Sequence, residues 1–295
     1  MGVIAPAIGF GLISGAILAI AAVGFTLQFG VTNVLNLAFG EVMITSAYIS
    51  YLADQAGWPI WALVAVAAIV GATLSFLLNA FLYSPFIRRG IGLFGMLIVA
   101  LATSLIGQNL LQIVFGARFS TLRVPPGRSF HPLGMVVTTA QLGIIAVAAL
   151  SLLLVHVVLR LTRLGKAMRA TATDPALART CGIQTDRVIG AAWAISGALC
   201  GIAGFTFVIN LGSFQSTTGG EILVPVVAAA ILGGVGHPYG AVLGALTVAM
   251  ASELSAAFFD PAYKSAVAFA VLIVVLLLRP QGIFAEVATQ KDAVA

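Results

Sequence analysis

Five long stretches without a charged residue restrict the fold more than any other feature of the sequence. They are residues 55–87, 90–117, 129–159, 188–220 and 222–252. A membrane-spanning helix needs about 20 apolar residues, and a nearly uncharged run of 18 or more predicts one. Only 8% of the 295 residues are charged, against about 25% in soluble proteins. The sequence therefore predicts an all-α polytopic membrane protein and excludes a soluble enzyme, a disordered chain, a disulfide scaffold and a nucleic-acid binder.

Apolar segments separated by charged or turn residues predict about nine spans, within a range of eight to ten. They lie near residues 6–29, 36–53, 58–84, 90–115, 135–160, 188–211, 221–236, 239–258 and 262–279. We interpret residues 1–295 as one transmembrane domain. Its expected parts are a first half-repeat (1–117), a linking span (135–160), a loop (160–187), a second half-repeat (188–280) and a polar tail (281–295).

Basic residues between the spans predict the orientation. The loop 160–187 carries six basic residues against Asp174 and Asp186. With nine spans, this loop lies on the same side as the basic residues that follow spans three and nine, namely Arg88, Arg89, Arg279 and Lys291. Because cytoplasmic loops carry the excess of Lys and Arg, that side is predicted to be cytoplasmic, with the N-terminus outside and the C-terminus inside. Three arginines in the loop 116–134, which this topology places outside, argue against it: Arg118, Arg123 and Arg128.

Two segments suggest an internal repeat. Residues 24–41 and 204–221 both begin Gly-Phe-Thr and end Gly-Glu over 18 positions. In the predicted topology the two segments run in opposite directions. Four spans, one linking span and four spans would then form an inverted repeat, an arrangement that in transporters places the substrate path at the repeat interface.

Polar residues inside apolar spans are the candidates for a substrate path, because buried polar groups in a membrane usually face a cavity or a partner. The candidates are Asn33, Asn36, Glu41, Gln108, Gln112 and Glu221. The segment 31–41 follows Gly30 and contains Gly40, which favours a broken helix, and such breaks bind small polar solutes. The alternatives are a cytoplasmic turn capped by asparagine and, for the two glutamines, hydrogen bonding between helices.

The loop 160–187 also contains a predicted short helix. Asp174 suits the N-cap, Pro175 the first helical position and Gly182 the C-terminal stop. The helix itself would cover residues 176–181. A helix that short is marginal in water, so its capping suggests that it docks on a partner subunit. A basic loop that lies near anionic lipid is the alternative.

No catalytic or metal-binding pattern is present in the sequence. There is no P-loop, no His-Glu-x-x-His and no Gly-x-Ser-x-Gly, and His131, His156 and His237 lack ligand spacing. We therefore expect a protein that is not an enzyme and that binds no metal or cofactor of its own.

Four ordered stretches resemble the permease subunits of branched-chain (hydrophobic) amino acid ABC importers. They are NVLNLAFGEVMITSAYIS (33–50), RLGKAMRATATDPALARTCGIQTDRV (163–188), ILGGVGHPYGAVLGAL (231–246) and LRPQGIF (278–284). One departure is Phe39, where relatives often carry a polar residue. If that position faces the path, the solute would be less polar or bulkier than in relatives.

The resemblance implies a division of labour among subunits. Such permeases pair with a second, similar permease, two ATPase subunits that bind the ATP, and a periplasmic solute-binding protein in the bacterial inner membrane. They import branched-chain amino acids or related solutes, including urea, short amides and aromatic acids, by alternating access. By resemblance, Asp174, Pro175, Leu177, Arg179 and Gly182 belong to the segment that couples to the ATPases. The alternatives are a secondary transporter or channel that needs no ATPase and, less favoured, an intramembrane enzyme.

Overall fold

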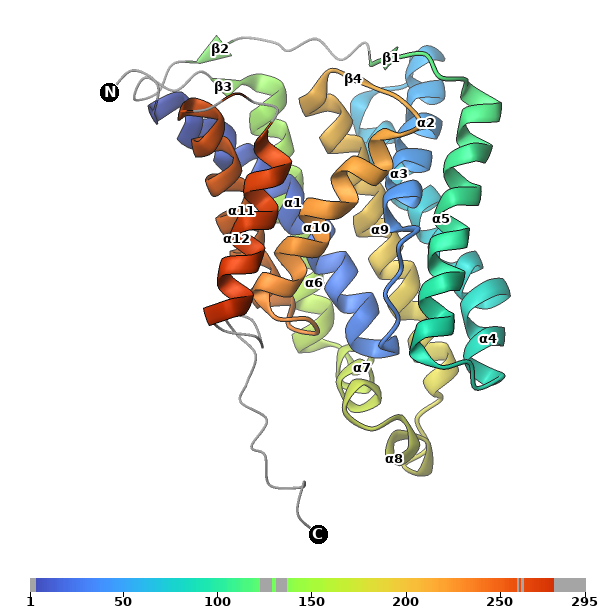
Figure 1. Ribbon diagram of the computed structural model, residues 1–295. Helices are drawn as coiled ribbons and strands as arrows, with labels where there is room; N and C mark the ends of the chain where they lie inside the picture. Colours follow the sequence, from blue (N-terminus) through green and yellow to red (C-terminus); the bar gives the residue numbers. More distant parts are fainter. Residues whose placement is uncertain (1–3, 123–128, 131–136, 259, 261–262, 279–295) are drawn as a thin grey trace.

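The computed structural model describes residues 4–122, 129–130, 137–258, 260 and 263–278, and it is a helical bundle (Figure 1). Within the described residues the helices are α1 (Ile4–Thr32), α2 (Phe39–Gln55), α3 (Ile60–Leu77), the π-helix η1 (Leu78–Tyr83), α4 (Ser84–Arg88), α5 (Leu93–Phe115), α6 (Thr139–Leu161), α7 (Arg163–Thr173), α8 (Pro175–Thr180), α9 (Thr185–Leu211), α10 (Thr218–Gly233), α11 (Pro238–Phe258) and α12 (Lys264–Leu278).

Each predicted span coincides with a helical segment. The third predicted span, 58–84, corresponds to α3, η1 and α4 together. Six helical segments of the described chain are long and apolar enough to cross a membrane. They are Pro6–Thr32, Ile60–Arg88, Leu93–Phe115, Thr139–Leu161, Thr185–Leu211 and Pro238–Phe258. Helix α10 and residues Ala266–Val275 of α12 are shorter apolar helices. The all-α polytopic class is confirmed, whereas the number of crossings and the inverted repeat stay predictions.

Helices α1 and α9 form the centre of the bundle. In their most apolar windows 72% and 67% of the residues are buried, against 11% in α5 at the periphery. Glycines let α9 approach α3 closely, because a methyl group on Gly197 would lie only 2.3 Å from the Gly71 carbonyl oxygen. Small residues at helix contacts are typical of membrane bundles, where packing rather than exclusion of water holds the helices together.

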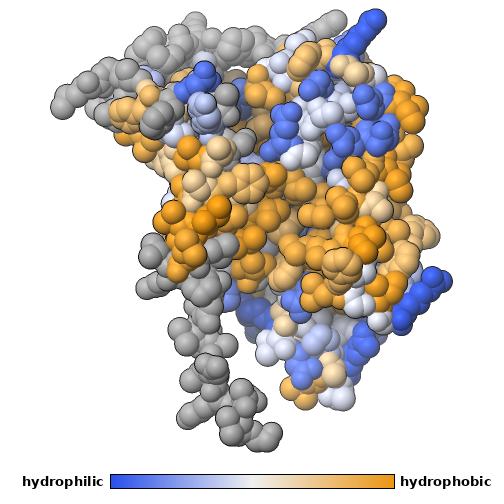
Figure 2. Space-filling model, viewed as in Figure 1, coloured by the Kyte–Doolittle hydropathy of each residue, from blue (hydrophilic) through white to orange (hydrophobic). Residues whose placement is uncertain are grey.

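An apolar band crosses the middle of the molecular face in Figure 2, with hydrophilic residues above and below it. Large apolar side chains on the outer helices are exposed, including Ile98, Leu105 and Ile113 of α5. An exposed apolar surface of this extent is costly in water but suits the hydrocarbon core of a bilayer. The surface therefore agrees with the charge-poor sequence.

Two pairs of two-residue strands lie outside the helices, a feature that the all-α prediction did not include. Strand β1 (Ser120–Thr121) pairs antiparallel with β4 (Ser213–Phe214), and β2 (Ser129–Phe130) pairs with β3 (Val137–Thr138). Figure 1 places β1 and β4 at the end of the bundle opposite α7 and α8. Arg118, just before β1, is thus far from the basic loop 160–187, as predicted. The other residues named in the topology prediction lie outside the described residues: Arg123, Arg128, Arg279, Lys291 and the tail 281–295.

The loop 160–187 contains two helices, of which only the second was predicted. Thr162 is the N-cap of helix α7, and its hydroxyl accepts a hydrogen bond from the Gly165 N–H. Arg169 of α7 donates to the carbonyl of Leu159 (2.9 Å) and so satisfies a free carbonyl at the end of α6. The buried face of α7, formed by Gly165, Met168 and Thr171, repeats every third residue. Only Met168 of these three is a large apolar residue, so the basic segment carries no clear apolar helical pattern, which explains why α7 was not predicted.

Candidate functional site

The helix break predicted for residues 31–41 is present. Asn33 has φ +52°, the left-handed conformation that ends helices, and its N–H bonds the carbonyl of Phe29 (2.7 Å). The chain then returns into the bundle as an extended segment before α2 begins at Phe39 (Figure 1). The first turn of α2 is therefore inside the bundle rather than at its surface.

Asn36 fixes this extended segment in place. Its side-chain oxygen accepts a hydrogen bond from the Tyr83 hydroxyl (2.8 Å) and another from the Ala38 N–H (3.1 Å). Tyr83 is the last residue of the π-helix η1, and its ring lies 4.9 Å from the ring of Trp193 on α9. Single-turn π-helices occur often at functional sites. Asn36, predicted as a path residue, thus has a clear structural role.

The broken helix crosses α10 at two glycines. A methyl group on Gly40 would lie 2.2 Å from the carbonyl oxygen of Gly219, so only glycine permits this contact. Both glycines are in the first turns of their helices, α2 and α10. Two helix N-termini, each carrying a partial positive charge, therefore meet inside the bundle.

Glu41 lies at this crossing and is only 5% exposed. Its Oε1 atom accepts a hydrogen bond from Ser104 of α5 (3.3 Å), and its Oε2 atom has no hydrogen-bond partner among the described residues. A methyl group on Gly219 would lie 3.2 Å from Oε2, so the carboxylate faces the first turn of α10 as well as its own helix. Converging helix N-termini stabilise a buried carboxylate, and broken helices of this kind form binding sites in transporters.

The other predicted path residues have different surroundings. Gln108 is half-buried, whereas Gln112 is exposed. Gly107, the residue before Gln108, lies next to the Glu41 side chain. Asn33 lines a cavity of about 170 Å³ beside Met96. Glu221 lines a separate cavity of about 700 Å³. Their role in a path stays a prediction.

Three residues of this region were not predicted: Tyr83, Ser104 and Gly219. Ser104 was the easiest to find, because it is one helical turn before Gln108 on the same face. Tyr83 is 47 positions from Asn36 in the sequence, and nothing in the pattern links the two. Phe39, which departs from the family pattern, is 1% exposed and packs edge-on against Phe25 at 5.6 Å between ring centroids.

The second candidate site is α8, at the opposite end from β1 and β4. The Asp174 carboxylate accepts hydrogen bonds from the Ala176 N–H (2.8 Å) and the Leu177 N–H (3.0 Å), which confirms the predicted N-cap. At the other end Gly182 has φ +85°, its N–H bonds the Arg179 carbonyl, and the Ile183 N–H bonds the Ala178 carbonyl. This is the Schellman arrangement that ends helices at glycine. Helix α8 ends at Thr180, one residue before the predicted end.

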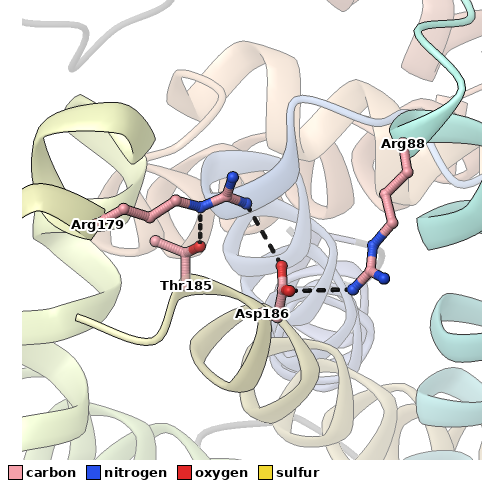
Figure 3. A network of polar contacts seen from close by, with 4 residues as sticks. All are labelled: Arg88, Arg179, Thr185 and Asp186. Atoms are coloured by element: carbon pink, nitrogen blue, oxygen red, sulfur yellow. Dashed lines mark hydrogen bonds and ion pairs between the residues drawn. The ribbon is translucent and has the colours of Figure 1, made fainter. Parts of the chain in front are cut away.

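Polar contacts tie α8 to the rest of the bundle (Figure 3). Arg179 donates from Nε to the Thr185 hydroxyl (2.6 Å) and pairs with Asp186 (3.4 Å). Asp186 also pairs with Arg88 at the end of α4 (3.0 Å). The ion pairs are exposed, so each adds little to stability, but together they fix the orientation of α8 relative to α9 and α4.

Helix α8 exposes one large apolar side chain. Leu177 is 61% exposed, whereas the neighbouring Ala178 is buried. The cysteine that follows the helix, Cys181, is also exposed. Helix α8 is therefore short, capped at both ends and exposed at Leu177, and its docking role stays a prediction.

The fold and these two sites define a polytopic α-helical membrane protein with a broken-helix crossing in its interior. Residues 7–276 match the family described as branched-chain amino acid transport system, permease component, and the chain belongs to this family. The family comprises transport permeases, not enzymes. The expected family is therefore confirmed.

Relatives match over nearly the full length. The chain is 32% identical to the high-affinity branched-chain amino acid transport system permease protein LivH of Escherichia coli K12, covering 95% of both proteins. It is 29% identical to the corresponding protein BraD of Pseudomonas aeruginosa, again with 95% coverage. It is also 26% identical to the permease protein LivM of E. coli K12, over 90% of this chain and 67% of LivM.

Two solved structures share the fold. PsaBC from Streptococcus pneumoniae, in complex with Fab, gives a TM-score of 0.52 at 14% identity, over 92% of this chain and 91% of the other. An ABC transporter assigned to the metal-chelate type, in an inward-facing conformation, gives 0.50 at 16% identity, over 92% and 85%. These likenesses support the fold alone.

Proposed function

We propose that this chain is the permease subunit of an ABC importer for branched-chain amino acids or a related small solute in a bacterial inner membrane. A second, similar permease, two ATP-binding ATPases and a periplasmic solute-binding protein would complete the importer. Relatives named as branched-chain amino acid transport permeases support the solute class. The match to two differently named permeases, LivH and LivM, supports pairing of this chain with a different one.

The observation that carries the proposal is the exposed, doubly capped α8 on a strongly basic end of the bundle. Basic residues of α4 and of the segment 160–187 gather at that end, whereas Arg118 lies at the other. By the positive-inside rule the α8 end is cytoplasmic. The N-terminus would then be outside and the tail 281–295 inside. Leu177 would insert into a pocket of an ATPase subunit, as an apolar anchor does at protein interfaces.

A mechanical connection supports coupling from α8 to the broken-helix crossing. Arg179 of α8 bonds Thr185 in the first turn of α9, so a movement of α8 displaces α9. Further along α9, the Cys200 thiol donates to the carbonyl of Phe39 (3.2 Å). One turn later, a methyl group on Gly204 would lie 2.2 Å from the Met43 carbonyl oxygen. Displacement of α9 would therefore shift the start of α2, next to Glu41, and alternate the access of the path.

The test replaces Leu177 by arginine in the assembled complex. We expect the Leu177→Arg complex to lose the ATPase subunits on purification or to hydrolyse ATP without coupled uptake, because the anchor is replaced by a charge. Leu161→Arg is the matched control, because Leu161 is also exposed at the end of α6 but lies outside α8.

The proposal fails if Leu177→Arg supports full uptake with the ATPases bound. Uptake by this chain alone in liposomes, without any ATPase, would instead support a secondary transporter or channel.

A further inference from the structure

A group of buried polar side chains lies beside the break between α1 and α2. Among the described residues, seven buried side-chain nitrogen or oxygen atoms have no hydrogen-bond partner. Four of them belong to this group: the amide nitrogens of Gln28 and Asn36, the indole nitrogen of Trp193 and the amide oxygen of Asn79. None of the four residues is more than 5% exposed. A buried polar group without a partner is costly, so four in one region require an explanation.

Direct contacts bring three of these residues together. The Tyr83 hydroxyl donates a hydrogen bond to the Asn36 side chain (2.8 Å), and the Tyr83 ring lies 4.9 Å from the ring of Trp193. Asn79 and Tyr83 are the two buried residues of η1, about one turn apart, so they share its inner face. Asn36, Asn79 and Trp193 therefore all adjoin the Tyr83 side chain or its helical face.

Gln28 joins the group from α1. Its side-chain oxygen accepts a hydrogen bond from the Ser196 hydroxyl (3.3 Å), and Ser196 is about one turn after Trp193 on α9. The amide nitrogen of Gln28 is left unpaired on the same side of α9 as the Trp193 indole. The four residues, which we call the polar cluster, thus lie where α1, the extended segment 33–38, η1 and α9 meet.

A cavity adjoins the polar cluster. It has a volume of about 170 Å³ and lies among the end of α1, α4 and the start of α5. Val34 and Met96 line it, and both pack in one group with Tyr83 and Trp193. A water molecule takes up about 30 Å³ of liquid volume, so the cavity has room for several. It therefore offers small molecules a route from the end of the bundle to the polar cluster.

The unpaired atoms specify what can bind there. Three of them are N–H donors, which do not coordinate a cation. The fourth is an oxygen acceptor, and none of the four residues is charged, which disfavours an anion. Water both donates and accepts, and a buried water molecule typically makes about three hydrogen bonds to buried polar groups. Water is the ligand that matches donors and acceptor together.

We propose that the polar cluster is a hydration site, which binds about two ordered water molecules inside the bundle. They bond the amide nitrogens of Gln28 and Asn36, the Trp193 indole N–H and the Asn79 oxygen. Water can change its partners when helices move, so the site lets segment 33–38 shift against α9 without leaving a buried polar group unpaired. The inference concerns the interior of this chain and does not rest on the proposed function.

The first experiment is X-ray hydroxyl-radical footprinting of the full chain in nanodiscs, measured by mass spectrometry. The radicals form from water, so a buried ring is oxidised where bound water lies beside it. We expect Trp193 and Tyr83 to be oxidised several-fold faster than Phe205, which is equally buried on α9 but about three turns further along. After brief mixing with ¹⁸O-labelled water, exposed Tyr239 should take up the label at once and Trp193 later, as expected for bound water.

The second experiment gives opposite signs for a hydrated and a dry site. Asn79→Leu keeps the size of the side chain and removes the amide. If water bonds the amide, its loss should lower the unfolding temperature by about 2–5 °C. In a dry site the same change removes an unpaired polar group and should raise it. Thr26→Val is the matched control, because the Thr26 hydroxyl is also buried and unpaired but lies on the opposite side of α1 from Gln28. It should leave the unfolding temperature unchanged or higher.

Two results would overturn the proposal. One is oxidation of Trp193 and Tyr83 no faster than that of Phe205, which decides the question even where a variant does not fold. The other is an Asn79→Leu protein at least as stable as the unaltered chain. Neither measurement involves ATP or the docking of α8, so both hold whatever the result with Leu177→Arg.

Discussion

The contact between α3 and α9 gives the sharpest prediction about stability. The ideal position of a methyl group on Gly201 is 2.0 Å from the Ala67 carbonyl oxygen, whereas ordinary contact begins at 3.4 Å. In Gly201→Ala the two helices would have to separate by about 1.4 Å at this point. Overpacking of a core typically costs about 1–3 kcal/mol, and a gap of 0.5–1 Å already removes a quarter to a half of the dispersion energy across it.

We therefore expect Gly201→Ala to lower the free energy of unfolding by about 2–3 kcal/mol. For a chain of this size that corresponds to a fall in unfolding temperature of roughly 4–10 °C. The assay is thermal unfolding in detergent at one fixed heating rate, because membrane proteins unfold irreversibly.

Gly143→Ala in α6 is the matched control, because no atom lies within 4 Å of its added methyl group. It should leave the unfolding temperature unchanged or slightly higher, because alanine is the better helix former. The reasoning is refuted if Gly201→Ala is as stable as Gly143→Ala.

Three further predictions concern the two sites. Tyr83→Phe removes the hydroxyl that donates a hydrogen bond to Asn36 but keeps the ring, so it should destabilise the protein by about 1–1.5 kcal/mol. The same thermal assay measures this, and an unchanged unfolding temperature would show that the hydrogen bond does not hold the extended segment. A membrane-impermeant maleimide should label exposed Cys181 in inverted vesicles but not in intact cells, and should leave buried Cys200 unlabelled in both; labelling of Cys181 in intact cells would reverse the proposed orientation. Arg88→Ala should change the unfolding temperature by less than 3 °C, because both partners of its ion pair with Asp186 are more than 60% exposed; a larger fall would mean that the pair stabilises the fold as well as orienting α8.

The helices were predictable from the sequence because hydrophobicity alone determines where a chain can cross a bilayer. Predicted starts were late where a helix begins with polar residues: α9 starts at Thr185 rather than 188, and α10 at Thr218 rather than 221. The capped α8 was predictable for a related reason, since Asp174, Pro175 and Gly182 act through local backbone geometry. Contacts between distant residues, such as Tyr83 with Asn36, leave no such local signal.

The predicted repeat shows where the sequence pattern is less informative. Its alignment equates Gly40 with Gly220 and Glu41 with Glu221, but in the structure the backbone of Gly40 contacts Gly219. One residue along an α-helix corresponds to a rotation of about 100°. This offset is enough to give two similarly placed carboxylates different environments. Glu41 is buried at the crossing, whereas Glu221 is exposed in a cavity of its own.

The contrast between rigid and broken elements limits how movement can pass through the molecule. Helix α9 has 27 residues without proline, so it is about 40 Å long and transmits a displacement along its axis. The elements that meet at Gly40 and Gly219 are less uniform: the non-helical segment 33–38 separates α1 from α2, and α10 contains Pro225, which removes a backbone hydrogen bond from the helix. A displacement imposed on α8 would therefore be carried by α9 and absorbed where α2 and α10 cross. Because Glu41 is at that crossing, we expect its surroundings to change most between the two states of the proposed alternating-access cycle.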